Sequence, residues 1–311
     1  MIAAQVVCDS ISVQEHRPLT FKLRYPKFIH GEFMTHRLIS RNASSSRAIP
    51  TSKLIEEVRS DALRAGPVFW GANQKGMQAV EELSDDHYQG TRLSPRMLAQ
   101  NYWKDAALEA MRIAEVMVEI GVHKQIVNRL LEPFSHINVV ATATEWDNFF
   151  GLRLHRDAQP EMRALAVAMW EARKASTPRL LRPGEWHLPF VDGDDGKGHP
   201  ITWDEKLDDI QVAIKVSVAR CARVSYESFE TGKRSTVEED LRLYDRLLGA
   251  QPLHASPAEH QATPDIQEWV TANELGPQWL HLGEHGNLVG WRQYRKMLPN
   301  EAVAPLPEGY S

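Results

Sequence analysis

The sequence predicts an α/β or α+β fold in which a mixed sheet is combined with long helices. Residues 19–25 alternate apolar and polar side chains, a pattern typical of a half-buried strand. Ser94 and Pro95 are a good N-cap and first helical residue, and a long apolar-periodic stretch follows them as far as Gly121. A chain of 311 residues with both patterns can form one large domain.

Further elements are predicted on both sides of this long helix. After Pro26, apolar residues at helical spacing from Phe28 to Leu38 predict a helix that follows the first strand. Three later stretches have the same helical pattern: 159–173, 210–224 and 236–248. In the last of them, Thr236 and Glu239 are spaced as a capping box.

Two segments are predicted to lie outside regular structure. Residues 182–204 are rich in Gly, Asp and Pro, a composition typical of a surface loop. Residues 304–311 contain two prolines and are predicted to form a tail on the surface.

Composition excludes several classes of protein. Apolar residues make up 42% of the chain and charged residues 25%, which is ordinary for a globular protein. The net charge of −5 argues against a nonspecific nucleic-acid binder. We see neither a signal-peptide pattern nor an apolar run of the roughly 18 residues that a membrane span needs. Cys8 and Cys221 have no metal or redox spacing, so we expect a cytoplasmic protein without a bound metal.

Residues 35–47 (THRLISRNASSSR) gather arginine, histidine, serine and asparagine side chains with no acidic residue among them. Guanidinium groups bind phosphate bidentately, and hydroxyl and backbone N–H groups complete such sites. The segment therefore predicts a site for a phosphorylated ligand. The alternative is a polar loop that caps a helix.

Residues 254–260 (HASPAEH) form a second compact motif. Ser256, Pro257 and Glu259 are spaced as a capping box with Pro at the first helical position, and a helix N-terminus can bind an anion. His254, Glu259 and His260 could also bind a metal. However, Glu259 and His260 are adjacent and would point to different faces of a helix, which argues against it.

Five segments together resemble the flavin-dependent thymidylate synthases. Residues 36–47 are similar to the family signature R-H-R-x-x-S-x-N-E-x-S-x-R, and residues 129–133 to its R-x-x-L-P. The other three segments resemble N-F-x-x-L-R followed by A-Q-x-E, A-R-V-S-aromatic, and H-x-S/T-P-x-E-H; they are residues 148–161, 222–226 and 254–260. Residues 290–296 resemble the family's Q-x-x-R-H stretch only weakly, and we assign them no role.

The order of these segments differs from that of the family. There, the A-R-V-S and H-x-S/T-P-x-E-H segments precede the R-H-R signature, whereas here they follow all the others. The resemblance therefore implies a circularly permuted thymidylate synthase-like fold, in which 1–311 form a single catalytic domain. Residues 51–122 match nothing in the family and are predicted to be a helical insertion.

The resemblance implies that the chain is a methyltransferase of nucleotide biosynthesis. It would methylate dUMP at C5, taking the carbon from methylenetetrahydrofolate and electrons from NADPH through FAD, without a cysteine nucleophile. Residues that match the family's flavin-binding positions are His36, Arg37, Asn148, Ser225, His254, Ser256 and Glu259. Ser45, Ser46 and Arg47 would bind the nucleotide and Arg129 its phosphate. Arg153 would lie against the pyrimidine, where its charge favours a developing anion.

Four departures from the family leave alternatives open. Thr35 replaces the first arginine of the signature and Ala43 its glutamate, Glu32 stands where glutamine is expected, and the asparagine expected near Thr142 is absent. The substrate could therefore be dCMP, or the product hydroxymethylated. Rival interpretations are a noncatalytic flavin or nucleotide binder, a metal-dependent hydrolase, and a nucleic-acid binder using Arg37, Arg41 and Arg47. The resemblance also implies a homotetramer.

Overall fold

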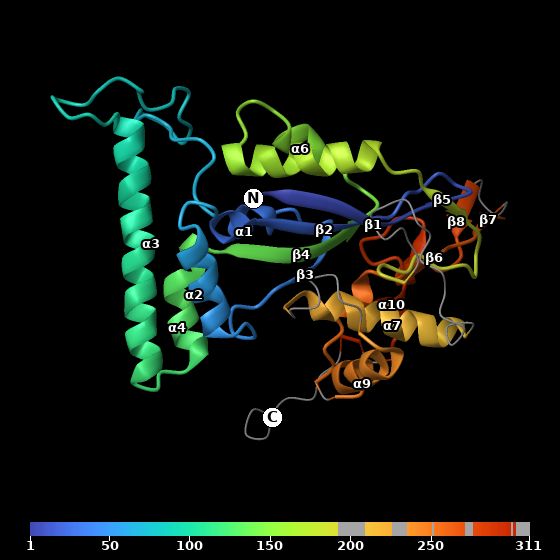
Figure 1. Ribbon diagram of the computed structural model, residues 1–311. Helices are drawn as coiled ribbons and strands as arrows, with labels where there is room; N and C mark the ends of the chain where they lie inside the picture. The colour runs from blue at the N-terminus through green and yellow to red at the C-terminus, as the bar shows by residue number, and fades with distance from the viewer. Residues whose placement is uncertain (192–208, 226–234, 251, 271–275, 300, 303–311) are drawn as a thin grey trace, which may run out of the picture.

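A five-stranded mixed sheet forms the centre of the protein in the computed structural model, which describes residues 1–191, 209–225, 235–250, 252–270, 276–299 and 301–302 (Figure 1). Its strand order is β3-β4-β2-β1-β5. The strands are β1 (Ala3–Ser12), β2 (Leu19–Pro26), β3 (Ser40–Ala43), β4 (His136–Ala143) and β5 (Arg179–Leu181). Only β5 runs parallel to its neighbour, and all other pairs are antiparallel. The predicted α+β class with a mixed sheet is confirmed.

Strands β2 and β4 form the middle of the sheet. The alternating segment that predicted a strand is β2, which pairs with β4 from Leu19–Ala143 to Pro26–His136. Every residue of β4 is buried. A strand covered on both faces does not need polar side chains at alternate positions, so β4 lacks the pattern that identifies β2.

Helices cover both faces of the sheet (Figure 1). Helix α6 (Pro160–Lys174) packs its Met162, Leu165 and Met169 on the side of the sheet that carries Phe21 and Leu23. Helix α7 (Ile210–Ala222) lies on the opposite face, where Cys221 packs against Val140 of β4. Cys8 and Cys221 are both buried.

Helix α9 (Val237–Leu248) packs against α7. The predicted capping box begins it: Glu239 N–H donates to Thr236 Oγ1 over 3.3 Å, and Thr236 N–H donates to Glu239 Oε2 over 3.0 Å. Asp240, which is fully buried, accepts hydrogen bonds from Arg220 Nε (2.9 Å) and Arg223 Nε (2.8 Å). This carboxylate therefore links the two helices.

Three helices form a separate layer beside the sheet: α2 (Thr51–Ser60), α3 (Pro95–Glu119) and α4 (Lys124–Leu131) (Figure 1). The predicted N-cap of α3 is confirmed, because Ser94 Oγ accepts a hydrogen bond from Met97 N–H over 3.2 Å. Gly121, with a φ of +85°, follows its end. Residues 51–122 thus contain two helices, and their status as an insertion stays a prediction.

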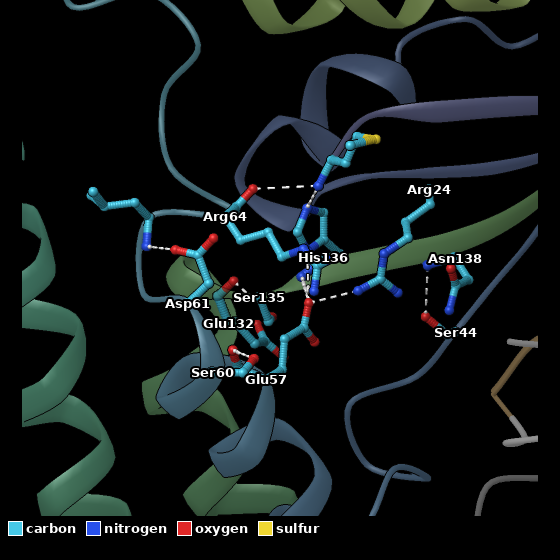
Figure 2. A network of polar contacts seen from close by, with 12 residues as sticks. Arg24, Ser44, Glu57, Ser60, Asp61, Arg64, Glu132, Ser135, His136 and Asn138 are labelled. Atoms are coloured by element: carbon cyan, nitrogen blue, oxygen red, sulfur yellow. Dashed lines mark hydrogen bonds and ion pairs between the residues drawn. The ribbon is translucent and has the colours of Figure 1, made fainter.

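Glu57 links α2 to the sheet through hydrogen bonds to Arg24 and His136, as Figure 2 shows. Its Oε1 accepts hydrogen bonds from Arg24 Nη2 of β2 (2.8 Å) and His136 Nδ1 of β4 (2.6 Å). Burial acts to raise the pKa of Glu57, but the hydrogen bond from His136 and the charge of Arg24 outweigh it and hold that pKa below its ordinary value. The helical layer is therefore joined to the sheet through a shared ionised carboxylate.

Some predicted elements were wrong in extent. The helix expected from Phe28 to Leu38 is a short 3-10 turn (Lys27–Ile29) followed by α1 (His30–Phe33). The chain then turns, leaving Met34 and Leu38 exposed, because residues 40–43 must enter the sheet as β3. Residues 35–47, whose alternative interpretation was a polar capping loop, therefore contain a strand at 40–43 between two irregular stretches.

Several later expectations were tested in part. Helix α7 ends at Ala222, and the rest of the stretch predicted as helical is a 3-10 turn, Arg223–Ser225. Of the predicted surface loop 182–204, residues 192–204 lie outside the described residues, as does the predicted tail 304–311. No helix in the described part of the chain is long and apolar enough to span a membrane.

Candidate functional site

A pocket of about 480 Å³ lies where three distant stretches of the chain meet. Its lining includes the first part of the 35–47 motif, the 254–260 motif and a C-terminal segment; the residues are Met34, Arg37, Ile39, Ser40, Arg41, Ser256, Glu259, Gly286, Asn287, Gln293, Arg295 and Lys296. Four of these side chains are cationic and one is a carboxylate. The pocket therefore favours an anionic ligand, and its volume is typical of small-molecule sites.

Strand β3 places the 35–47 motif at this pocket. Ser40 pairs with Thr142 of β4, and Arg41 follows it. The Arg41 guanidinium donates through Nη1 to the carbonyl oxygens of His36 (2.7 Å) and Met34 (3.2 Å). These bonds close the turn between α1 and β3, so Arg41 shapes the pocket as well as lining it.

His36 and Arg153 are in direct contact. Arg153 Nε donates to His36 Nε2 over 2.9 Å, and the edge of the His36 ring meets Phe149. Burial, and then the charge of Arg153, lowers the pKa of His36 to about 4. The imidazole is therefore neutral at pH 7, and since Nε2 accepts, its proton is assigned to Nδ1. His36, which was predicted to bind the flavin, and Arg153, which was predicted to contact the pyrimidine, are thus hydrogen-bonded to each other.

Helix α5 (Asp147–Arg153) carries Arg153 in its last turn and Asn148 in its first. Phe149 and Phe150 of the same helix are buried in the main core. Their burial fixes the helix against the sheet, while the side chain of Asn148 is exposed. The structure thus places Asn148 on the surface of the helix that presents Arg153.

The predicted capping box in the 254–260 motif was wrong. Ser256–Glu259 is a single 3-10 turn whose N-cap is Ala255, without a side-chain capping bond. No helix can follow, because His260 is fully buried against Thr142 and the chain enters β6 (Ala262–Pro264) two residues later. The turn nevertheless brings Ser256 and Glu259 to the pocket.

The other two predicted flavin residues are placed differently. His254 is exposed and does not line the pocket. Ser225 ends the 3-10 turn after α7, and its side chain lies outside the described part of the structure.

Two of the predicted nucleotide residues, Ser46 and Arg129, contact Glu132, which stands at the leucine position of R-x-x-L-P. Glu132 Oε1 accepts from Ser46 Oγ (2.5 Å) and pairs with Lys27 Nζ (2.7 Å) and Arg129 Nη1 (3.2 Å). Burial acts to raise the pKa of Glu132, but the bonds from Lys27 and Ser46 outweigh it and lower that pKa. Ser45 is half-buried and Arg47 is exposed. A phosphate here would compete with Glu132 for Arg129.

Sequence reasoning missed one wall of the pocket. Asn287, Gln293, Arg295 and Lys296 come from the C-terminal part of the chain. The only signal was the weak resemblance of residues 290–296 to the Q-x-x-R-H stretch.

The geometry does not favour two of the rival interpretations. Among the described residues, no group of three or more His, Cys, Asp or Glu side chains lies together as a metal site would require. His254 is exposed whereas His260 is fully buried, so the proposed ligands do not converge. Arg41 is half-buried in the pocket wall, which weakens an exposed basic surface for nucleic acid.

The α+β fold is combined with a cationic pocket that is suited to a phosphorylated small molecule, as the 35–47 motif predicted. The sequence profile of the thymidylate synthase complementing protein family matches residues 8–179, more than half of the chain. The chain belongs to this family, which confirms the resemblance seen in the sequence.

Individual relatives agree with this assignment. The flavin-dependent thymidylate synthase of Sulfolobus acidocaldarius is 27% identical over 218 residues, 68% of either chain. Two solved structures are more distantly similar. The UMP/dUMP methylase PolB from Streptomyces cacaoi, bound with 5-Br dUMP, is 16% identical, with a TM-score of 0.40 over 56% of this chain and 89% of its own. Thymidylate synthase X from Helicobacter pylori, with FAD and dUMP, is 14% identical, with a TM-score of 0.34 over 50% and 67%.

Proposed function

We propose that this protein is a flavin-dependent methyltransferase that methylates C5 of a dUMP-type nucleotide. The observation that carries the proposal is the family match over residues 8–179, which contains the 35–47 motif and Arg153. The name of the Sulfolobus relative supports the same activity. The dCMP, hydroxymethyl and noncatalytic alternatives find no support in these comparisons.

The pocket suits FAD. Arg37 and Arg41, from the 35–47 motif, fit the phosphates of a dinucleotide, and Ser40, Ser256 and Asn287 provide hydrogen-bonding groups. When bound, the flavin would supply the redox chemistry, while the protein provides orientation and fixed charge. Neutral His36 would offer its Nδ1 proton beside this pocket.

Arg153 is proposed to act on the nucleotide. Its guanidinium is permanently charged and held by His36, so it can stabilise negative charge on the pyrimidine as C5 becomes nucleophilic. We place the nucleotide's sugar and phosphate toward Ser45, Ser46, Arg47 and Arg129. Methylenetetrahydrofolate as carbon donor and NADPH as reductant complete the proposal.

An absorption spectrum of the purified protein tests the proposed function. We expect a flavin band that anaerobic NADPH bleaches and that returns only when methylenetetrahydrofolate and dUMP are added together. Adding dCMP in place of dUMP identifies the base. A colourless protein that fails to take up added FAD would contradict the proposed enzymatic activity. The family membership would then reflect common ancestry alone.

Replacing Arg47 with alanine should weaken dUMP binding without affecting the fold. Arg47 is exposed, so its loss leaves no buried partner, whereas a charge-assisted bond to phosphate contributes about 1.5–3 kcal/mol, or roughly 10- to 150-fold in Kd. Calorimetric titration with dUMP measures the change. Arg59→Ala, whose side chain is paired with Glu56 and Glu115 on the helical layer, is the control. An unchanged Kd for Arg47→Ala would remove this residue from the phosphate site.

A homo-oligomer, which we propose to be a tetramer, is supported by an apolar stripe on α3. Tyr102, Ile113, Val116 and Ile120 are spaced on one face of this helix and are exposed, Tyr102 and Ile120 by about 70% of their surface. We expect Val116→Lys with Ile120→Lys to reduce the mass measured by light scattering. Val118→Lys, on another face of α3, is the control. A monomeric parent protein would contradict the proposal.

The permutation, the single domain 1–311 and the cytoplasmic location remain predictions. The proposed permutation rests on the order in which the family-like segments follow one another in the sequence.

A further inference from the structure

Residues 286–296 form the C-terminal wall of the pocket, and this wall is hydrogen-bonded to the 35–47 motif. Asn287 Nδ2 donates to the carbonyl oxygen of Leu38 (2.8 Å), and its Oδ1 accepts from Ser40 Oγ (2.9 Å). Gln293, which is buried, donates to the carbonyl oxygen of Glu259 (3.0 Å) and to Asn287 Oδ1 (2.9 Å). One segment therefore contacts both motifs, so the position of the wall is fixed.

This wall holds two cations at the pocket. Strand β9 (Trp291–Gln293) pairs with β6 directly after the 254–260 motif, and α10 (Tyr294–Met297) follows it. Arg295 and Lys296 of α10 both line the pocket. Their side chains are 29% and 34% exposed, so their charged ends remain accessible to a ligand.

Carboxylates orient these cations. Arg295 Nη1 contacts Glu259 Oε1, Arg295 Nε donates to Glu301 Oε2 (2.8 Å), and Lys296 Nζ donates to Glu301 Oε1 (2.6 Å). Two carboxylates thus face two cations. Arg37 is exposed and makes no hydrogen bond or ion pair that is seen within the described residues, and the guanidinium of Arg41 has only backbone carbonyls as hydrogen-bond partners there. The four cations outnumber the two carboxylates, so the net positive charge at the pocket favours an anionic ligand.

We propose that Arg295 and Lys296 are phosphate-binding residues of this pocket, acting together with Arg37 and Arg41. The inference rests on the proposed function, which places FAD at this pocket and the dUMP phosphate toward Arg47 and Arg129; the diphosphate of FAD is therefore the expected ligand, and the monophosphate of dUMP is the alternative that the test separates from it. A guanidinium already oriented by Glu259 and Glu301 loses little conformational entropy when it binds phosphate. If Arg295 and Lys296 had a purely structural role, the Kd values for FAD and dUMP would not depend on their charges.

Binding measurements on the full chain test the proposal. The variant Arg295→Met with Lys296→Met keeps the apolar stems and removes both charges. Calorimetry with FAD, riboflavin and dUMP separates the two sources of phosphate, because riboflavin has the flavin ring without phosphate. The matched control is Arg292→Met, which lies in the same segment, pairs with Glu284 and does not line the pocket.

We expect the Kd of one phosphorylated ligand to rise roughly 10- to 100-fold in the double variant, with riboflavin unchanged. A loss confined to FAD identifies its diphosphate, and a loss confined to dUMP identifies the nucleotide. Unchanged binding of both ligands, when the parent protein binds them, overturns the inference while the proposed function stands.

Two further measurements separate failure of this inference from failure of the proposed function. If the parent protein binds neither FAD nor dUMP, the proposed function fails, and thermal stabilisation by pyrophosphate becomes the readout. Stabilisation that is lost in the double variant would support the phosphate site alone, and none in the parent would overturn it. If the double variant does not fold, as judged by circular dichroism, Lys296→Met carries the test, since Lys296 has one carboxylate partner among the described residues.

Discussion

Arg153→Ala should lower the rate of nucleotide methylation by about 100- to 1000-fold while flavin stays bound. This range is typical for removal of one group that stabilises charge in a transition state. Arg153 makes its observed hydrogen bond to His36 and does not line the cationic pocket, so flavin affinity should change little. Single-turnover kinetics with the reduced enzyme measure the rate, and flavin fluorescence measures retention.

The same variant should change the titration of His36. Burial and the charge of Arg153 together hold the pKa of this histidine at about 4, against an ordinary value of 6.5. Without the guanidinium, the pKa of His36 should rise toward 6.5, because the protonated imidazole no longer faces that charge. NMR of the imidazole as a function of pH reports this directly. A pKa that rises but stays below 6.5 distinguishes loss of the contact from unfolding, because burial still lowers it in the folded variant whereas unfolding would restore the ordinary value.

Arg156→Ala is the matched control for both measurements. Arg156 lies three positions further along, is 85% exposed and contacts Asp157 alone among the described residues. It should leave both the rate and the His36 pKa unchanged. Normal turnover in Arg153→Ala would end the role proposed for this residue at the pyrimidine.

Asp240→Ala should lower the free energy of unfolding by about 3–5 kcal/mol. The carboxylate is fully buried and accepts from Arg220 (2.9 Å), Arg223 (2.8 Å) and Ser235 Oγ (2.5 Å). Its removal leaves two largely buried guanidinium groups without their counter-ion, a cost that exceeds the net worth of the pairs themselves.

Urea denaturation followed by circular dichroism measures this loss. Asp245→Ala, an exposed position on the same helix, should change stability by less than about 0.5 kcal/mol. Because Arg223 belongs to the segment that resembles A-R-V-S, the variant should also weaken FAD binding. A stability equal to that of the parent would mean that α7 and α9 are held together by their apolar contacts alone.

Local signals were sufficient for much of the fold. The N-cap at Ser94, the capping box at Thr236 and the alternation in β2 each reside within a few residues, and each prediction is confirmed. Strand β4 carried no such signal, since burial on both faces removes alternation. In the 254–260 motif, the capping-box residues mark only a 3-10 turn, because burial of His260 against Thr142 directs the chain into β6.

The sequence indicated several residues that line the candidate pocket, but not how the predicted residues are grouped in space. The motifs identified Arg37, Ser256 and Glu259 at the pocket, and His36 with Arg153 beside it. They did not indicate that Ser46 and Arg129 gather around Glu132 instead. The wall with Arg295 and Lys296 depends on hydrogen bonds between residues far apart in sequence, and no local pattern encodes such pairings.

The hydrogen bond between Ser40 and Asn287 joins residues 247 positions apart in the sequence, and this separation determines when the pocket can form during synthesis. At the usual 5–20 residues per second, the ribosome needs roughly 10–50 s to travel from one to the other. The β1, β2 and β4 sheet with its α6 cover can fold in that interval, whereas the pocket must wait for its last wall. A nascent chain would therefore complete this pocket only after residues 286–296 have been synthesised, so a ligand that needs all of its walls would bind after that point.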